Sequence, residues 1–116
     1  MAPEVTACPA CGTKNRVPVA AKGSPRCASC KAPLPWVVPA TDADLAAALD
    51  TGHLVLLDLW APWCAPCRQV APVLVSLAKR YAGRVKVVKV DVDQNPRAAA
   101  QYDARSIPTL VLIQRG

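Results

Sequence analysis

The sequence predicts an α/β domain with a parallel or mixed sheet, preceded by a small module held together by metal. Beyond residue 36, strand-like apolar runs alternate with helical patterns in the order βαβαβ, which places helices between the strands of one sheet. All six cysteines lie in three C-x-x-C pairs, and two of these pairs fall in a proline-rich stretch without a regular apolar period. We therefore divide the chain into residues 1–36 and residues 37–116.

Length and composition exclude several classes of protein. A chain of 116 residues has room for one ordinary domain, or for a small domain with an extra module. With 53% hydrophobic and 19% charged residues it is too apolar for intrinsic disorder, yet no apolar run approaches the roughly 20 residues of a spanning helix. The N-terminus has neither the basic nor the apolar region of a secretion signal, so we expect a cytoplasmic protein without membrane association.

The first elements of the second region form a strand, a helix and a strand. Val37–Val38 begins a short strand, and residues 41–44 resemble a capping box that opens an Ala- and Leu-rich helix. Thr51 and Gly52 end this helix. Residues 54–60 are apolar apart from Asp58, which is typical of a central strand covered on both faces.

The remaining elements continue the alternation. Pro66 suits the first turn of a helix whose apolar residues recur every three or four positions until Gly83 ends it. Residues 85–92 predict a β-branched strand, residues 95–102 a short helix, and residues 109–113 a third long strand.

The third cysteine pair lies where a buried strand hands over to a helix. A thiol at a helix N-terminus faces free backbone N–H groups, which stabilise the thiolate, so Cys64 is the predicted nucleophile. Cys67 lies one turn further on, close enough to resolve a mixed disulfide. Trp63 and Pro66 would limit solvent and fix the loop. The alternative is half of another metal site, but no further ligand follows and His53 is the only histidine.

This turn and its surroundings resemble the thioredoxin family, whose signature is a Trp-Cys-Gly-Pro-Cys turn after a strand with a buried aspartate. The matching residues are Asp58, Trp60, Pro62, Trp63, Cys64, Pro66, Cys67, Pro72, Lys89, Asp93–Pro96 and Ile107–Thr109. The resemblance implies a thioredoxin-like mixed sheet flanked by helices, and a protein-disulfide reductase in electron transport. It also implies a redox-active Cys64–Cys67 disulfide, disulfide-containing substrate proteins, and re-reduction by a flavoprotein thioredoxin reductase. Ala65 replaces the usual glycine, which leaves a more oxidising oxidase or isomerase as an alternative.

The resemblance also implies roles for residues outside the turn. Asp58 would accept the proton of Cys67, with Lys89 modulating it; the alternative is a carboxylate that reaches solvent or a backbone amide. The Ile107–Pro108 peptide would be cis, leaving the backbone of Ile107 free to pair with an extended substrate, although a turn is the simpler interpretation. Ile107 and Pro108, with Trp63 and Pro66, would form the substrate-binding surface.

The four remaining cysteines have the spacing of a zinc ribbon. Cys8 and Cys11 are separated from Cys27 and Cys30 by a loop of the length found in Cys₄ zinc sites. One structural Zn²⁺ per chain would supply most of the folding free energy of residues 1–36, on the order of 10 kcal/mol. Two disulfides, or a redox relay to Cys64, are the alternatives.

The net charge of +6 is concentrated in the first region, where five Lys or Arg face Glu4 alone. Four zinc-bound thiolates would reduce this excess, and no aromatic residue is interleaved with the basic ones, so nucleic-acid binding is not favoured. A ribbon containing Lys14–Pro18 before a thioredoxin-like domain resembles the bacterial thioredoxin 2 subgroup. Protein contact or redox-dependent zinc release would then be the ribbon's role, and a zinc-binding interaction or redox-sensing module is the alternative function.

The thioredoxin pattern continues beyond Gly116 with a further strand and helix. We therefore expect a C-terminally incomplete domain in which residues 109–113 form an exposed apolar edge. The sequence is either a fragment of a longer protein, which we favour, or a chain that dimerises through that edge.

Overall fold

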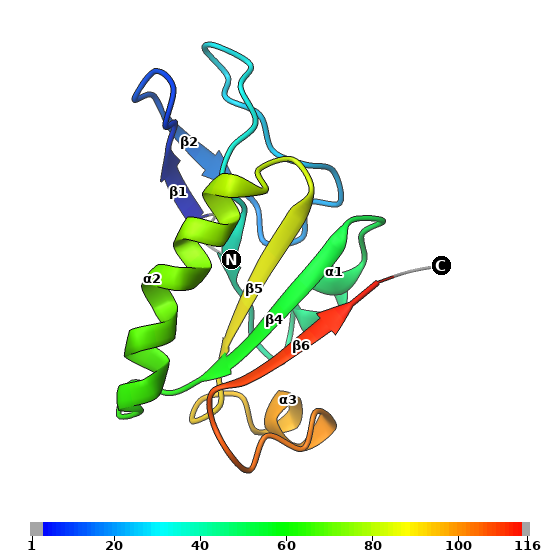
Figure 1. Ribbon diagram of the computed structural model, residues 1–116. Helices are drawn as coiled ribbons and strands as arrows, with labels where there is room; N and C mark the ends of the chain where they lie inside the picture. The colour runs from blue at the N-terminus through cyan, green and yellow to red at the C-terminus, as the bar shows by residue number, and fades with distance from the viewer. Residues whose placement is uncertain (1–3, 115–116) are drawn as a thin grey trace.

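The structure is a computed structural model that describes residues 4–114. The first residue of the predicted N-terminal region, Met1, and the last residue of the predicted second region, Gly116, lie outside the described residues. Figure 1 shows a twisted sheet with helices on both sides and a small hairpin packed beside it.

The N-terminal region contains a hairpin that the sequence pattern did not predict. Strand β1 (Glu4–Ala7) pairs antiparallel with β2 (Lys14–Val17). Gly12 has a positive φ of 80° in the connecting loop, a conformation that glycine adopts without steric cost. The alternation along β2 buries Asn15 and Val17. This strand does not show as an alternation of apolar and polar residues in the sequence, because Asn15, one of its two buried residues, is polar.

The main sheet is mixed, as predicted. Its strand order is β3 (Val37–Pro39), β5 (Val85–Asp91), β4 (Leu54–Trp60) and β6 (Thr109–Ile113). Strands β3, β5 and β4 run parallel, whereas β6 runs antiparallel to β4. This confirms the α/β fold class and the predicted strands.

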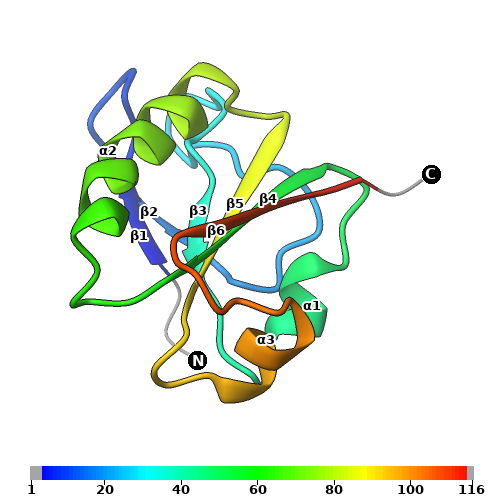
Figure 2. The same ribbon diagram turned by 60° about the horizontal axis from the view of Figure 1, so that its bottom comes forward.

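Three helices flank the sheet. Helix α2 (Ala65–Arg80) lies on one face, and α1 (Leu45–Leu49) and α3 (Pro96–Gln101) lie on the other (Figures 1 and 2). The predicted turn before α1 is present, because the Thr41 N–H donates to the Asp44 carboxylate. No helix in the described part of the chain combines the length and apolarity needed to cross a bilayer.

The apolar core runs continuously through both regions. Val17, Leu34 and Trp36 of the N-terminal region belong to the same buried cluster as Val38 and Leu57 of the main sheet. Trp36 is completely buried. The buried apolar side chains of residues 4–36 therefore pack in the same cluster as those of the α/β domain.

One part of the sheet is open to solvent. Within residues 4–114, β6 is an edge strand, and its Leu110 and Leu112 are 48% and 68% exposed. A neighbouring hollow of about 340 Å³ is almost wholly apolar and is lined by Leu54, Leu56, Leu77, Tyr81, Arg84, Val85 and Leu112. The predicted exposed apolar edge is therefore present in the structure.

Candidate functional site

Cys64 and Cys67 are joined by a disulfide at the start of α2, with their Cα atoms 5.2 Å apart. Cys64 is the N-cap residue, and its Sγ accepts a hydrogen bond of 3.1 Å from the Cys67 N–H. Pro66 occupies the first turn, where its missing N–H leaves no helical hydrogen bond unmade. The Cys67 backbone N–H therefore points toward the sulfur of Cys64, in line with the prediction that this sulfur faces a free N–H at the helix N-terminus.

The loop before β6 closes one side of this disulfide. The peptide bond between Ile107 and Pro108 is cis, in agreement with the resemblance. The Ile107 carbonyl oxygen lies 3.7 Å from the Cys64 Sγ. On the surface beside them, Trp63 is 67% exposed, and its Nε1–H donates to Asp93 over 2.9 Å. A cysteine sulfur, the Ile107 backbone carbonyl and an exposed indole thus lie close together.

Asp58 is buried within β4, two residues before the strand ends. It is 2% exposed, and its Oδ1 has no hydrogen-bond partner among the described residues. Burial raises the pKa of the Asp58 carboxyl, and the positive charge of Lys89 partly offsets this rise. Lys89 lies directly opposite Asp58 in the parallel register of β4 and β5, with its Nζ 5.2 Å from the ring centroid of Trp60.

The other four cysteines form one compact cluster without a disulfide. Cys8 and Cys30 have their sulfurs 3.6 Å apart, and Cys11 and Cys27 have theirs 3.5 Å apart. All four sulfurs lie within 4.8 Å of one another. Zinc with four thiolate ligands has sulfur–sulfur distances of about 3.8 Å, since each Zn–S bond is about 2.3 Å. The cluster therefore fits a tetrahedral metal ion.

Electrostatics at this cluster also suit a cation. The backbone N–H of Cys30 lowers the pKa of the Cys27 thiol to about 6, and the side chain of Asn15 adds to this effect. The backbone N–H of Ala32 lowers the pKa of the Cys30 thiol. The neighbouring thiols, of which Cys8 has the largest effect, and burial outweigh this contact and raise the pKa of Cys30 to about 11. The four sulfurs cannot all ionise easily beside one another, and a divalent cation would remove this conflict.

Asn15 is a supporting residue that the sequence interpretation missed. Its Oδ1 accepts from the Ala28 N–H over 2.9 Å, and its Nδ2 donates to the Thr13 carbonyl over 3.0 Å. Asn15 thus ties the loop after one cysteine pair to the loop of the other. A buried asparagine inside a short strand was the signal that could have indicated it.

Lys86 was also missed, although it is completely buried in β5. Its Nζ donates to the backbone carbonyls of Val19, Ala21 and Ala48 at distances of 2.7–3.0 Å. The signal was a charged residue within a strand of β-branched residues, because Lys86 stands between Val85 and Val87.

The disulfide and the four-cysteine cluster lie at opposite ends of the molecule. The loop between β1 and β2, which carries one cysteine pair, lies near the end of α2, whereas the disulfide lies at the start of α2 (Figure 1). This separation gives no support to direct exchange of thiols between the two sites.

A mixed α/β sheet with a C-x-x-C disulfide at the start of a flanking helix defines a recognisable class of disulfide-carrying domains. Comparison with known families gives the particular one: the thioredoxin family model matches residues 36–116. The chain therefore belongs to the thioredoxin family.

Individual relatives agree with this assignment. The chain is 56% identical over 68 residues to thioredoxin 1 of Nostoc sp., a match covering 59% of this chain and 64% of the relative. It is 54% identical to the thioredoxin of Synechocystis sp. with the same coverage. It is 49% identical over 81 residues to the thioredoxin of Haemophilus influenzae, covering 69% of this chain and 76% of the relative. The chain thus spans 64% of the length of the two cyanobacterial relatives.

Proposed function

We propose that this chain is a protein-disulfide reductase that uses the Cys64–Cys67 dithiol. The observation that carries the proposal is the disulfide at the N-terminus of α2, with the Cys67 N–H directed at the Cys64 sulfur. Such a setting stabilises a thiolate, which is the nucleophile in disulfide exchange. Membership of the thioredoxin family supports the same assignment.

The reaction consists of two sulfur exchanges. The Cys64 thiolate attacks one sulfur of a substrate disulfide, forms a mixed disulfide and releases the other substrate sulfur as a thiolate. Cys67, after losing its proton, attacks the Cys64 sulfur, which breaks the mixed disulfide and releases the second substrate thiolate. Two electrons pass to the substrate, and the enzyme ends as the Cys64–Cys67 disulfide.

Asp58 is the proposed acceptor of the Cys67 proton. A buried carboxylate with one unpartnered oxygen is a stronger base than a solvated one, because burial raises its pKa. The nearby cation of Lys89 limits that rise and would keep the carboxylate available for proton transfer. The roles proposed for Asp58 and Lys89 come from the thioredoxin family pattern. The pairing of these two residues across β4 and β5 is compatible with them.

Substrate would bind along the surface formed by Trp63, Pro66, Ile107 and Pro108. The Ile107 carbonyl lies beside the reacting sulfur, where it can accept a hydrogen bond from an extended substrate backbone. The exposed indole of Trp63 offers apolar contact area next to it. Disulfide-containing proteins are the proposed substrates, a flavoprotein thioredoxin reductase is the proposed electron donor, and the cytoplasm is the proposed compartment.

For the N-terminal region we propose a zinc ribbon of residues 1–36 before a thioredoxin domain of residues 37–116, as in the thioredoxin 2 subgroup. Cys8, Cys11, Cys27 and Cys30 would hold one Zn²⁺, which supplies a structural crosslink and no redox chemistry. The sulfur distances and the N–H groups directed at Cys27 support this ligand set.

A second candidate function is redox sensing by the same cluster. Cys11 and Cys30 are exposed, whereas Cys8 and Cys27 are buried. Oxidants would reach the exposed sulfurs first and could release the metal. In that case the Cys64→Ser variant would keep the biological response, which separates this candidate from the reductase.

Insulin reduction by dithiothreitol, followed as turbidity, tests the reductase proposal. The folded parent chain should shorten the lag before precipitation, and Cys64→Ser should not. A parent chain that is folded by circular dichroism but leaves the lag unchanged would contradict the proposal. A dithiol found mainly as the disulfide in a glutathione buffer would instead favour the oxidase or isomerase that Ala65 leaves open.

A further inference from the structure

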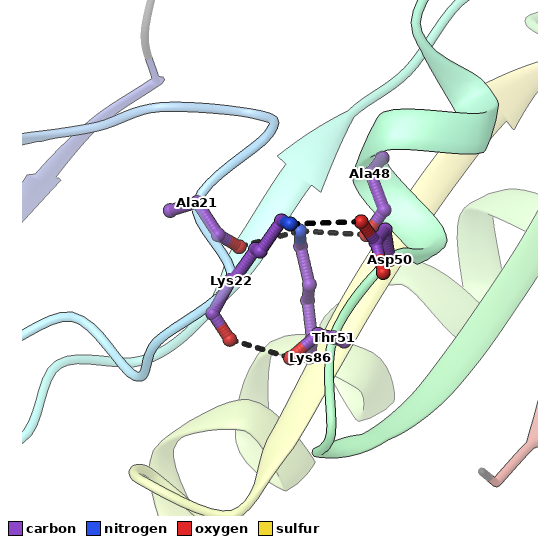
Figure 3. Close-up of polar contacts among 6 residues, drawn as sticks. All are labelled: Ala21, Lys22, Ala48, Asp50, Thr51 and Lys86. Carbon is purple, nitrogen blue, oxygen red and sulfur yellow. Dashed lines mark hydrogen bonds and ion pairs between the residues drawn. The ribbon is translucent and has the colours of Figure 1, made fainter.

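The junction between the ribbon and the thioredoxin domain contains a fully buried cation. Lys86 reaches from β5 toward the ribbon loop, residues 18–26, which joins the two cysteine pairs of the proposed metal site (Figure 3). A buried ammonium is costly unless its donors are all satisfied, so its surroundings indicate why the residue is charged.

The three donors of the Lys86 ammonium match three acceptors. Nζ lies 2.8 Å from the Val19 carbonyl, 3.0 Å from that of Ala21 and 2.7 Å from that of Ala48. An ammonium group has three donors and no acceptor, so this arrangement satisfies its hydrogen-bonding capacity. Burial lowers the pKa of Lys86 to about 8, which still leaves the group mainly protonated at neutral pH.

The three acceptors belong to two different parts of the chain. Val19 and Ala21 lie in the ribbon loop of residues 18–26, between β2 and Cys27, whereas Ala48 lies in the last turn of α1. The last carbonyls of a helix have no intrahelical partner, and Lys86 supplies one for Ala48. One cation thus holds the ribbon loop and the helix end together.

Neighbouring contacts reinforce this junction. The Thr51 hydroxyl donates to the Lys22 carbonyl, and the Lys22 ammonium forms an ion pair of 3.0 Å with Asp50 (Figure 3). The ring centroid of the buried Trp36 lies 5.0 Å from the Lys86 Nζ, within the range of a cation–π contact. The ribbon loop is therefore fixed at Val19, Ala21 and Lys22 to the end of the domain away from the disulfide.

We propose that Lys86 is a positioning residue for the four-cysteine site, because its ammonium fixes the loop that connects the two cysteine pairs. The inference rests on the proposed metal site. Its consequence is energetic coupling: the docked loop favours metal binding, and bound metal in turn stabilises the docked thioredoxin domain. Such coupling is reciprocal by thermodynamic necessity.

Cobalt(II) titration of the reduced full-length chain tests this proposal, since thiolate-to-cobalt absorption reports both affinity and ligand geometry. Lys86→Met should need about tenfold more free cobalt for half-saturation, a typical size for coupling between sites. The final absorption spectrum should match that of the parent, because the four ligands are unchanged. Lys79→Met, on the exposed face of α2, is the matched control and should titrate like the parent.

Two further variants keep the test decisive. Lys86→Arg retains charged donors and should recover most of the lost cobalt affinity. If the site needed only the size and shape of the lysine side chain, Lys86→Arg would not recover this affinity. If Lys86→Met does not fold, Thr51→Val removes a milder contact to the same loop and should weaken cobalt binding in the same direction.

The outcomes separate the two proposals. A parent chain that binds no cobalt overturns the metal site itself. A parent that binds cobalt, with Lys86→Met folded and titrating identically to it, leaves the metal site standing and overturns the role of Lys86. Thr51→Val folded and titrating identically to the parent overturns the coupling between the docked loop and the metal site.

Discussion

The same C-x-x-C spacing produces two different sulfur arrangements in this chain. Cys64 and Cys67 stand alone at a helix start, and they are bonded to each other. In the N-terminal region, two pairs face each other, and sulfur separations of 3.5–3.6 Å join one pair to the other. The C-x-x-C spacing alone therefore does not decide the chemistry of a cysteine pair; the groups that face the pair decide it.

The two groups also differ in how the surrounding chain supports them. The disulfide is held by one helix and the loop before β6, with a buried carboxylate on the adjoining strand. The cluster is held by short loops that depend on Asn15 and, further away, on Lys86. The first setting favours exchange of electrons and protons, and the second favours a fixed ligand geometry.

The largest expected difference between the two groups is in catalysis. Cys64→Ser should reduce insulin reduction to the rate of dithiothreitol alone, because the thiolate that attacks the substrate is removed and Cys67 is the buried resolving thiol. Cys30→Ser removes one sulfur from the cluster and should leave most of the activity at a temperature where the variant is folded. Equal losses in both variants, with folding verified by circular dichroism, would contradict the division of roles.

Metal removal should give the next largest effect, on stability. Stripping the reduced chain with a strong chelator should lower its melting temperature by about 10 °C or more, since each kcal/mol corresponds to about 4 °C in a chain of this size. Calorimetry of metal-loaded and stripped protein measures the shift. An unchanged melting temperature, with metal loss verified by elemental analysis, would show that the cluster does not support the fold.

Asp58→Asn should remove a pH-dependent contribution to stability from the disulfide region. The folded state holds the Asp58 proton more tightly than the unfolded state, because burial raises its pKa. Parent stability should therefore fall relative to the variant as pH rises from the ordinary aspartate range through that raised pKa. Each unit of pKa difference corresponds to about 1.4 kcal/mol.

Urea unfolding of both proteins at several pH values measures this difference. The variant should be the more stable protein at neutral pH and should lose most of this advantage in acid. Its resolving step should be slower, since an amide cannot accept the Cys67 proton. A stability difference independent of pH would exclude titration of Asp58 as the cause.

The smallest expected effect concerns the exposed ion pair at the ribbon junction. The side chains of Lys22 and Asp50 are 72% and 38% exposed, and such surface pairs contribute about 0–1 kcal/mol. Lys22→Met should thus change the unfolding free energy far less than Lys86→Met, and any change should shrink in 1 M salt. A loss as large as that of Lys86→Met would mean that the surface pair is the main contact.

Much of the fold follows from local patterns in the sequence. The long strands and α2 have clear periodicity with glycine or proline at their ends, so their bounds are predicted within a residue or two. The hairpin β1–β2 could not be predicted in this way, because its strands have four residues each and a polar side chain on the buried face.

The candidate sites divide in a similar manner. Spacing indicates the six cysteines, and the family resemblance supplies Asp58 and the cis peptide before Pro108. Lys86 and Asn15 act through backbone groups of distant segments, and no sequence pattern shows which carbonyls a fold will bring to a side chain. Supporting residues of this kind become visible only in three dimensions.

The order of cysteine alkylation tests the comparison most directly. Reduced, zinc-loaded protein is treated with iodoacetamide at pH 7, and each modified peptide is followed by mass spectrometry. Cys64 should react first, about tenfold faster than a free peptide cysteine, while the four cluster cysteines should react only after a chelator is added. Cluster cysteines that react before Cys64 in the zinc-loaded chain, or a Cys64 no faster than the peptide, would contradict the account.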